Sequence, residues 1–474
     1  MPRRPIHVTG APEAPLRAAL TALRAELDIP TAFPPEVLAE ADRAATTPRL
    51  PTYDATDIPF LTIDPPGSKD LDQALHLSRQ GTGYRVRYAI ADVAAFVTPD
   101  GPLDKEAHRR VTTLYFPDTR IPLHPDVLGE SAASLLPNEP RPAALWTIDL
   151  DPDGRTVAVD VRRALVRSRA RLDYEGAQKQ IDTGTAEEPL ALLRTIGELR
   201  EHLEAERGGI SLNVPEQEIV ERDDTYELTY RAPLPADGWN AQLSLLTGMA
   251  AADLMLGYGT GVLRTLPTAP DGAVGRLRRV AEALRVDWPH HVPYSLLIRS
   301  LDPHDPRHAA FLQECTSLLR GAGYTVFRDG TLPALTTHAA VAAPYAHCTA
   351  PLRRLADRYA TELCLAAMAG DSPPEWVLAA LDALPERMAE GGHRANAVER
   401  ASVDIVEAAV LAGHVGETFD ACVIDLENHH GTVHLESPAV VGRIDGDHLP
   451  LGEHLRVRLT RADPATRTVR FTPA

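Results

Sequence analysis

Lysine, aromatic residues and cysteine are all scarce in this chain of 474 residues. Only three of its 48 basic residues are lysines (Lys69, Lys105 and Lys179), and aromatic residues make up 5%. The four cysteines form no Cys-x-x-Cys pair, so the sequence indicates neither a zinc site nor a disulfide framework. No apolar run reaches the length of a membrane span. We therefore expect no membrane partner and a cytoplasmic location.

The net charge of −18 argues against a protein that coats nucleic acid unspecifically. It leaves room for an enzyme that holds a nucleic acid in a local basic channel. The hydrophobic fraction of 44% and the charged fraction of 24% are ordinary for a globular protein. At this length we expect two to four domains with a large core, and a monomer.

Carboxylates follow the apolar run from Ile58 to Ile63, which has the pattern of a buried strand. Asp64 ends this run, Pro65-Pro66-Gly67 must turn the chain, and Asp70 and Asp72 come directly after the turn. Carboxylates brought together in this way favour a hard divalent cation such as Mg²⁺ or Mn²⁺. On spacing alone, an acidic surface loop after an edge strand explains the same residues.

The stretch resembles the catalytic signature of the RNase II (RNB) family of exoribonucleases, a pattern of the form T-I-D-x-x-x-x-x-D-x-D-D-A. Thr62-Ile63-Asp64 and Asp70-Leu71-Asp72 match it, whereas Gln73 stands where the family usually has a second adjacent aspartate. The resemblance implies that Asp64, Asp70, Asp72 and Gln73 hold Mg²⁺, with Mn²⁺ as a possible substitute. Because an amide oxygen brings no negative charge, we expect a raised metal requirement.

Two further segments match the family in the same order along the chain. Thr113-Leu114-Tyr115-Phe116-Pro117 places Tyr115 where the family stacks a tyrosine on the 3′-terminal base. The second strong motif is Y-A-H-C-T-A-P-L-R-R-L-A-D, residues 345–357, with Arg353 and Arg354 as the implied phosphate-binding pair. Pro351 is predicted to be the first residue of a helix, which places both arginines in its first turn and makes Ala350 or Thr349 the N-cap. Without the resemblance, a surface arginine pair bound to neighbouring acids is the simpler interpretation.

The implied fold is α+β: an RNB-type mixed α/β catalytic domain over residues 51–412, a C-terminal OB-type (S1-like) β-barrel over 413–474, and a small N-terminal helical segment over 1–50. The periodicity predicts helices over 12–28 and 35–45, either as a helix-turn-helix-like module or packed on the next domain. A long helix is predicted from Trp239 to Leu263, with Gln242 at a position where relatives carry a glutamate. Many relatives have two cold-shock-type barrels upstream, for which residues 1–32 leave no room, so we expect a more open RNA entrance.

Five short β-prone runs in the last 59 residues predict the C-terminal barrel: 419–424, 431–435, 440–444, 455–459 and 469–472. The stretch has only two phenylalanines for base stacking, so we expect a weak RNA contact made by arginines. The residues expected to make it are Arg443, Arg456, Arg458 and Arg461.

The resemblance implies hydrolytic, processive 3′-to-5′ degradation of single-stranded RNA to 5′-nucleoside monophosphates. Asp72, Asp70, Asp64 and Arg353 are the expected catalytic residues, and RNA is expected to contact Tyr115, Arg353, Arg354, Arg456 and Arg458. Two alternatives stay open at this point. One is a catalytically impaired RNA-binding or regulatory protein, and the other is a metal phosphodiesterase that acts on a substrate other than RNA.

Overall fold

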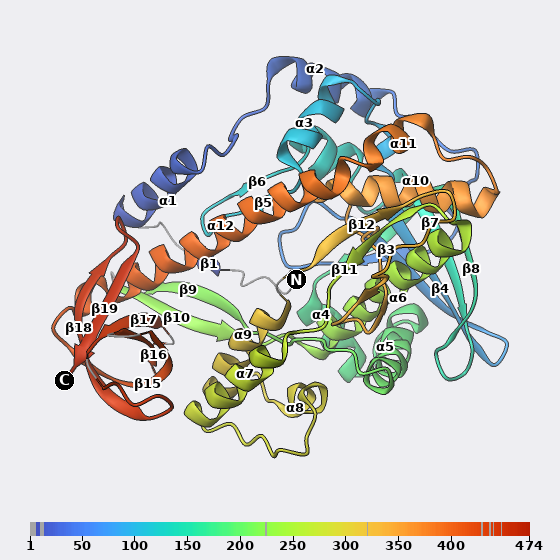
Figure 1. Cartoon of the computed structure of the whole chain (residues 1–474). Coiled ribbons are helices and arrows are strands. Elements are labelled where there is room, and N and C mark those ends of the chain that lie inside the picture. Colours follow the sequence, from blue (N-terminus) through green and yellow to red (C-terminus); the bar gives the residue numbers. More distant parts are fainter. Residues whose placement is uncertain are drawn as a thin grey trace.

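Two closed five-stranded β-barrels lie at opposite ends of the computed structural model (Figure 1). The structure describes residues 6–9, 14–222, 225–319, 321–427, 430–435, 438, 440–446 and 448–474. The first barrel has the strand order β2-β3-β4-β7-β8 and the second the order β15-β16-β17-β19-β18. The first is formed by β2 (Phe60–Ile63), β3 (Gln73–Gln80), β4 (Gly83–Ala91), β7 (Pro140–Leu150) and β8 (Thr156–Leu172).

The first barrel closes because its shortest strand pairs with two partners. β2 runs antiparallel to β3 and parallel to the end of β8, where Ile63 lies opposite Leu172. Side chains such as Tyr88 on β4 and Trp146 on β7 are fully buried and belong to a core cluster shared with the helices that cover the barrel. Truncation of such a residue typically costs about 3–5 kcal/mol, so this barrel is a rigid platform for the strand ends.

The long helix α6 (Pro235–Tyr258) packs in that same core cluster and is buried along most of its length. It ends at Gly259, whose φ of +85° gives the left-handed cap that glycine adopts without strain. The predicted helix to Leu263 was therefore too long, because the chain turns at Gly259 into the strand β11 (Gly261–Thr265). At Gly248 a Cβ atom would lie 2.2 Å from the Tyr345 ring, so glycine allows the segment before Arg353 to rest directly on α6.

The two N-terminal helices pack on different parts of the molecule. α1 (Ala14–Glu26) contacts α12 (Leu384–Leu411), whereas α2 (Pro35–Thr46) contacts α3 (Pro102–Arg110). They lie apart at the upper left and the top of Figure 1. This arrangement is packing on neighbouring elements, the second of the two alternatives drawn from the sequence. Residues 12 and 13, with which the predicted first helix began, are outside the described part of the chain.

The helix α12 spans the distance between the two barrels (Figure 1). It contacts α10 (Leu355–Ala369) and α11 (Glu375–Leu381), and near its end it contacts β18 and β19 of the second barrel. The predicted α+β class and the predicted C-terminal five-stranded barrel are both confirmed. The strands of that barrel are β15 (Thr418–Glu427), β16 (His430–Leu435), β17 (Val441–Asp445), β18 (His454–Asp463) and β19 (Thr468–Pro473).

The remaining elements are short sheets and helices outside the two barrels. The other strands are β1 (Ile6–Thr9), β5 (Leu114–Tyr115), β6 (Arg120–Ile121), β9 (Glu216–Arg222), β10 (Thr225–Arg231), β12 (Gly323–Phe327), β13 (Thr337–His338) and β14 (Ala343–Pro344). The other helices are α4 (Tyr174–Asp182), α5 (Glu188–Glu206), α7 (Asp271–Ala283), α8 (Tyr294–Ser300), α9 (Pro306–Cys315), α10 (Leu355–Ala369) and α11 (Glu375–Leu381). All four cysteines are buried, and none of them forms a disulfide. Among the described residues, no helix has the length and apolar character needed to cross a membrane.

Candidate active site

The acidic stretch lies where the sequence placed it, at the end of a buried strand. β2 ends at Ile63, the chain turns at Gly67 with a φ of +82°, and β3 begins at Gln73. Asp64 is half-buried and its backbone N–H donates to the Leu172 carbonyl at 3.2 Å, so the end of β8 anchors it. Asp72 is 5% exposed. The turn therefore returns both carboxylates to one end of the barrel.

The two motifs meet at Asp72. Its Oδ1 accepts a hydrogen bond from the backbone N–H of Leu352 at 2.8 Å, across 280 positions of sequence. Its Oδ2 lies 3.5 Å from Nε of Arg353, whose side chain is 45% exposed. The Asp72 carboxylate is thus fixed from the second motif, while the Arg353 guanidinium still faces solvent.

Burial raises the pKa of both flanking carboxyls. Desolvation raises the pKa of Asp72 to about 8, although Arg353 and the Leu352 N–H favour its charged form. Desolvation also raises the pKa of Asp64 to about 7, against the opposing effect of Arg353. The negative charge of Asp70 acts in the same direction on both. Without a further cation, the site therefore disfavours full ionisation of its own carboxylates.

The helix start predicted at Pro351 was wrong, because α10 begins at Leu355 and Arg354 is its N-cap. Residues 351–353 form a turn, so neither arginine is in the first helical turn. The backbone N–H of Ala350 is also not free, since it donates to Oδ1 of the fully buried Asp357 at 2.7 Å. A side chain from inside the helix therefore satisfies this N–H group.

The two arginines have different surroundings. Arg354 makes a bidentate pair with Asp357, with both nitrogen–oxygen distances at 2.8 Å, and this pair fixes the turn. The Arg353 carbonyl accepts from the N–H of Thr113 at 3.0 Å and from the Thr112 hydroxyl at 2.9 Å. Only Arg353 among the two extends a partly exposed guanidinium beside Asp72. A direct contact of Arg354 with RNA stays a prediction.

Tyr115 lies on a hairpin that the second motif holds in place. β5 pairs with β6 so that Tyr115 is directly opposite Arg120. The Tyr115 side chain is 37% exposed, and its hydroxyl is close enough to interact electrostatically with Arg353. A partly exposed tyrosine ring at this place can stack on a base.

Gln73 is held at both ends of its amide. Its Nε2 donates to the Thr349 carbonyl at 2.7 Å, and its Oε1 accepts from the Tyr88 hydroxyl. Asp70 is also engaged, because Nη1 of Arg120 lies 2.6 Å from its Oδ1. In the described part of the chain, no three His, Cys, Asp or Glu side chains converge as a metal-binding group.

The donor set nevertheless fits one hard divalent ion. Asp64 and Asp72 offer carboxylate oxygens, and Mg²⁺ is commonly held by one or two carboxylates together with waters and substrate phosphates. Both carboxylates are desolvated, which raises their pKa, and the positive charge of Arg353 acts on both in the opposite direction. A cation at this place would supply the missing compensation of charge.

Several residues at the site were not singled out from the sequence. Tyr174 lies within electrostatic reach of Asp64 and accepts a hydrogen bond from Asn240 at 3.1 Å, and Ser244 contacts Thr349 at 2.7 Å. Arg120 could have been found, because Pro117-Asp118-Thr119 is a turn sequence that returns residue 120 opposite residue 115. The others depend on tertiary packing and leave no local signal.

Gln242 and Asp92 lie in separate buried networks. Gln242, at the position where relatives carry a glutamate, is 3% exposed and donates to Glu204 at 2.5 Å. Asp92, which directly follows β4, accepts from Nε of Arg163 at 2.8 Å. Both residues have structural contacts.

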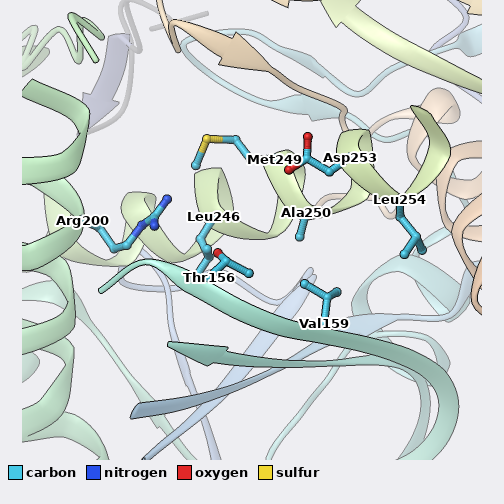
Figure 2. A pocket seen from close by; sticks show the side chains of 8 residues that line it. All are labelled: Thr156, Val159, Arg200, Leu246, Met249, Ala250, Asp253 and Leu254. Atoms are coloured by element: carbon cyan, nitrogen blue, oxygen red, sulfur yellow. The ribbon is translucent and has the colours of Figure 1, made fainter. Parts of the chain in front are cut away.

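A separate hollow of about 380 Å³ lies between α5, α6 and the start of β8 (Figure 2). Thr156 is at its floor, whereas the opposite end of β8, at Leu172, anchors Asp64. It therefore does not belong to the site described above. Its lining residues are Thr156, Val159, Arg200, Leu246, Met249, Ala250, Asp253 and Leu254.

The arginines expected in the second barrel all have protein partners. Arg443 pairs with Asp445 at 2.9 Å and Arg461 with Asp463 at 3.1 Å. Arg456 donates to the Thr418 hydroxyl at 2.6 Å, and Arg458 donates to the Gly416 carbonyl at 3.0 Å. Each is on an exposed face, so a weak phosphate contact stays a prediction.

Comparison with known proteins identifies the class of this fold and site. The family model for the RNB domain matches residues 52–369, and the model for the RNase II-type exonuclease C-terminal S1 domain matches residues 417–474. The chain belongs to the RNB family.

Ribonuclease R of Aquifex aeolicus is 26% identical to it over 98% of this chain and 71% of that protein. The exosome complex exonuclease dis3 of Schizosaccharomyces pombe is 30% identical over 64% of this chain and 33% of its own length. The chain thus spans only part of these curated relatives.

Solved structures of low identity share the fold. Mycoplasma genitalium RNase R in complex with ribose-methylated single-stranded RNA superimposes with a TM-score of 0.84 at 20% identity, covering 97% of this chain and 78% of that one. Yeast Ssd1, described as a pseudonuclease, superimposes with a TM-score of 0.70 at 15% identity, covering 95% and 57%. The architecture alone is thus compatible with both active and inactive members.

Proposed function

We propose that the protein is a hydrolytic 3′-to-5′ exoribonuclease that degrades single-stranded RNA to 5′-nucleoside monophosphates. The observation that carries this proposal is the junction of the two motifs at Asp72, with the Leu352 N–H at 2.8 Å and Arg353 at 3.5 Å. It joins an acidic site to an accessible guanidinium beside an accessible tyrosine ring. These are the groups that hydrolysis of a terminal phosphodiester requires.

Each residue has a role that its surroundings support. Tyr115 stacks on the terminal base and so sets the position of the scissile bond. Arg353 donates to the phosphate oxygens and stabilises the charge that develops on them. Asp64 and Asp72 are the residues that would hold Mg²⁺, which when bound supplies charge neutralisation and a more acidic water. The Asp357–Arg354 pair keeps the turn that carries Arg353 in place.

One observation favours the alternative of a catalytically impaired RNA-binding protein: Gln73 is neutral and its amide is hydrogen-bonded at both ends. Its amide is bound on both sides and carries no charge, where the family usually has an aspartate. Such a protein would bind single-stranded RNA through the same tyrosine and arginine without turnover.

The test is to incubate the protein with uniformly labelled and with 5′-labelled single-stranded RNA in Mg²⁺ or Mn²⁺. The active protein is expected to release labelled mononucleotides and to shorten the 5′-labelled strand from its 3′ end. Asp72→Asn should abolish this while RNA binding persists. Asp57→Asn is the matched control, because it makes the same change at an exposed carboxylate outside the site. Binding without release of mononucleotides by the unmodified protein would establish the impaired alternative.

A further inference from the structure

A largely buried arginine lines the separate hollow between α5, α6 and the start of β8 (Figure 2). Arg200 is 5% exposed, and its Nη1 donates to the Gly154 carbonyl at 2.9 Å. Its Nε is buried and has no hydrogen-bond partner within the described chain. No carboxylate of the described residues forms an ion pair with it either. Burial of a charge is costly unless an opposite charge and hydrogen bonds compensate it, so the protein itself satisfies this guanidinium only in part.

The acidic residue one turn further along α5 is already engaged. Glu204 is 1% exposed, pairs with Arg299 at 2.9 Å and accepts a hydrogen bond from Gln242 at 2.5 Å. Burial lowers the pKa of Arg200 to about 10, the positive charge of Arg207 acts in the same direction, and Glu204 opposes both. Arg200 is therefore charged at neutral pH, and an anion that enters the hollow meets a positive charge that has no ion-pair partner in the described chain.

Apolar side chains form much of the remaining wall. Leu246 and Met249 lie three residues apart on one face of α6, and Val159 contributes from β8. The volume of about 380 Å³ is within the range of roughly 300–1,000 Å³ that is typical of small-molecule sites. A hollow of this kind can cover the apolar body of a small ligand, and burial of that apolar surface stabilises the complex.

A carboxylate lines the hollow away from Arg200. Asp253 is exposed and is one turn beyond Met249 on α6, and in Figure 2 Arg200 and Asp253 lie on opposite sides of Met249. Within the described chain Asp253 has no ion-pair partner. The hollow therefore presents a positive and a negative charge with apolar surface between them.

We propose that this hollow binds a small organic anion with an apolar body, whose carboxylate or phosphate group pairs with Arg200. The incoming anion supplies the counter-charge that the described residues do not, and charge-assisted hydrogen bonds to a guanidinium are among the strongest polar contacts. Asp253 repels a second anionic group and attracts a cationic one, so a zwitterion binds more tightly than a simple anion. The inference goes beyond the proposed function, because the hollow lies apart from Asp72 and takes part in no step assigned there.

The experiment measures the Kd of six-carbon probes by isothermal titration calorimetry with the unmodified full chain, in the absence of RNA. Hexanoate and hexyl phosphate test the two anionic groups, and each is also tested with an amino group at its far end, as 6-aminohexanoate and 6-aminohexyl phosphate. Hexylammonium has the cationic end alone. At least one simple anion should bind saturably, its amino form should bind several-fold more tightly, and hexylammonium should bind more weakly than that anion by roughly tenfold or more.

Arg200→Gln retains a hydrogen-bond donor for the Gly154 carbonyl and removes the charge. It should weaken binding of the tighter anion by roughly tenfold or more. Its unfolding temperature should equal or exceed that of the unmodified protein, because the variant no longer buries a charge that lacks a partner. Arg194→Gln changes an exposed arginine of α5 outside the hollow and is the matched control, with an unchanged Kd. Asp253→Asn should remove the advantage of the amino group and leave the simple anion bound at least as tightly.

Absence of saturable binding by both simple anions would overturn the inference, and so would equal binding of hexylammonium and the tighter anion. An unchanged Kd in folded Arg200→Gln would overturn it as well, and a lowered unfolding temperature of that variant would then show that Arg200 only holds the turn at Gly154. If Arg200→Gln does not fold, the probe series on the unmodified protein and on Asp253→Asn still decides the question. Loss of the proposed nuclease activity leaves these results unaffected, because none of the measurements includes RNA.

Discussion

The carboxylate of Asp72 accepts the backbone N–H of Leu352 at 2.8 Å, and this bond joins the first barrel to the turn that carries Arg353. A strand end and a helix start that are 280 positions apart are thereby held in register. The acidic residue is at once a candidate metal ligand and the anchor of Arg353, the arginine that we propose binds the phosphate. Oδ1 of Asp72 accepts the Leu352 N–H, and Oδ2 lies beside Nε of Arg353.

Gln73→Asp should lower the Mg²⁺ concentration for half-maximal RNA degradation. The added charge next to Asp72 attracts the ion, and a gain of about 1.4 kcal/mol corresponds to roughly tenfold. The measurement is the initial rate of mononucleotide release over a Mg²⁺ series. Gln73→Asn is the matched control, because it shortens the side chain equally without adding charge. Equal Mg²⁺ requirements for the two variants would show that charge at this position is not limiting.

Much of this arrangement follows from local sequence, and the exceptions have a common cause. The β-prone runs located β2 of the first barrel and the five strands of the second, and the Pro-Pro-Gly turn returns Asp72 to the same end of the first barrel as Asp64. Pro351 was misread because proline suits a turn as well as a helix start, and the deciding contact is Asp357 reaching back to the Ala350 N–H. Gln73 contacts Tyr88 on the neighbouring strand β4 and Thr349 in the loop before Arg353, and Gln242 contacts Glu204 on α5, so no local pattern reports these partners.

Tyr115→Ala should weaken binding of the 3′ end of single-stranded RNA by roughly 5- to 150-fold, the equivalent of about 1–3 kcal/mol of lost stacking. Tyr115→Phe retains the ring and should stay near the unmodified affinity. The measurement is the Kd of a short labelled RNA with the Asp72→Asn protein, which prevents turnover. If the alanine variant binds as tightly as the phenylalanine variant, the ring does not stack on the base.

We expect the second barrel to bind single-stranded RNA weakly, through electrostatic contacts with its phosphates. Arg456→Ala/Arg458→Ala removes two exposed guanidinium groups. The present partners of Arg456 are the Thr418 hydroxyl and, at 3.9 Å, the Asp420 carboxylate, and the partner of Arg458 is the Gly416 carbonyl. For single strands, each lost phosphate contact should reduce the slope of log K against log salt by about 0.7. Titrations at several salt concentrations measure this slope. Arg17→Ala, an exposed arginine on α1, is the control and should leave the slope unchanged.

His124, which lies against Pro351 of the second motif, should make the stability of the protein depend on pH. The ring is 4% exposed, and burial together with Arg358 lowers its pKa to about 4, although its hydrogen bond to the Pro351 carbonyl opposes the shift. In the unfolded chain the pKa is about 6.5, so the unfolded state binds the proton first as the pH falls. The contribution of a neutral His124 is complete above pH 6.5 and is lost as the pH falls toward 4, by at most about 3 kcal/mol.

His124→Gln keeps a hydrogen-bond donor for the Pro351 carbonyl and cannot titrate. Urea unfolding at pH 7.5 and at pH 5 should therefore show a larger loss of unfolding free energy in the unmodified protein than in this variant. Comparison of the two proteins at each pH removes the effect of other histidines such as the half-buried His338, whose pKa partial burial also lowers to about 4. Parallel losses in both proteins would mean that His124 is already protonated in the folded state at pH 5, and that its ring does not hold the turn before Arg353 as a neutral group.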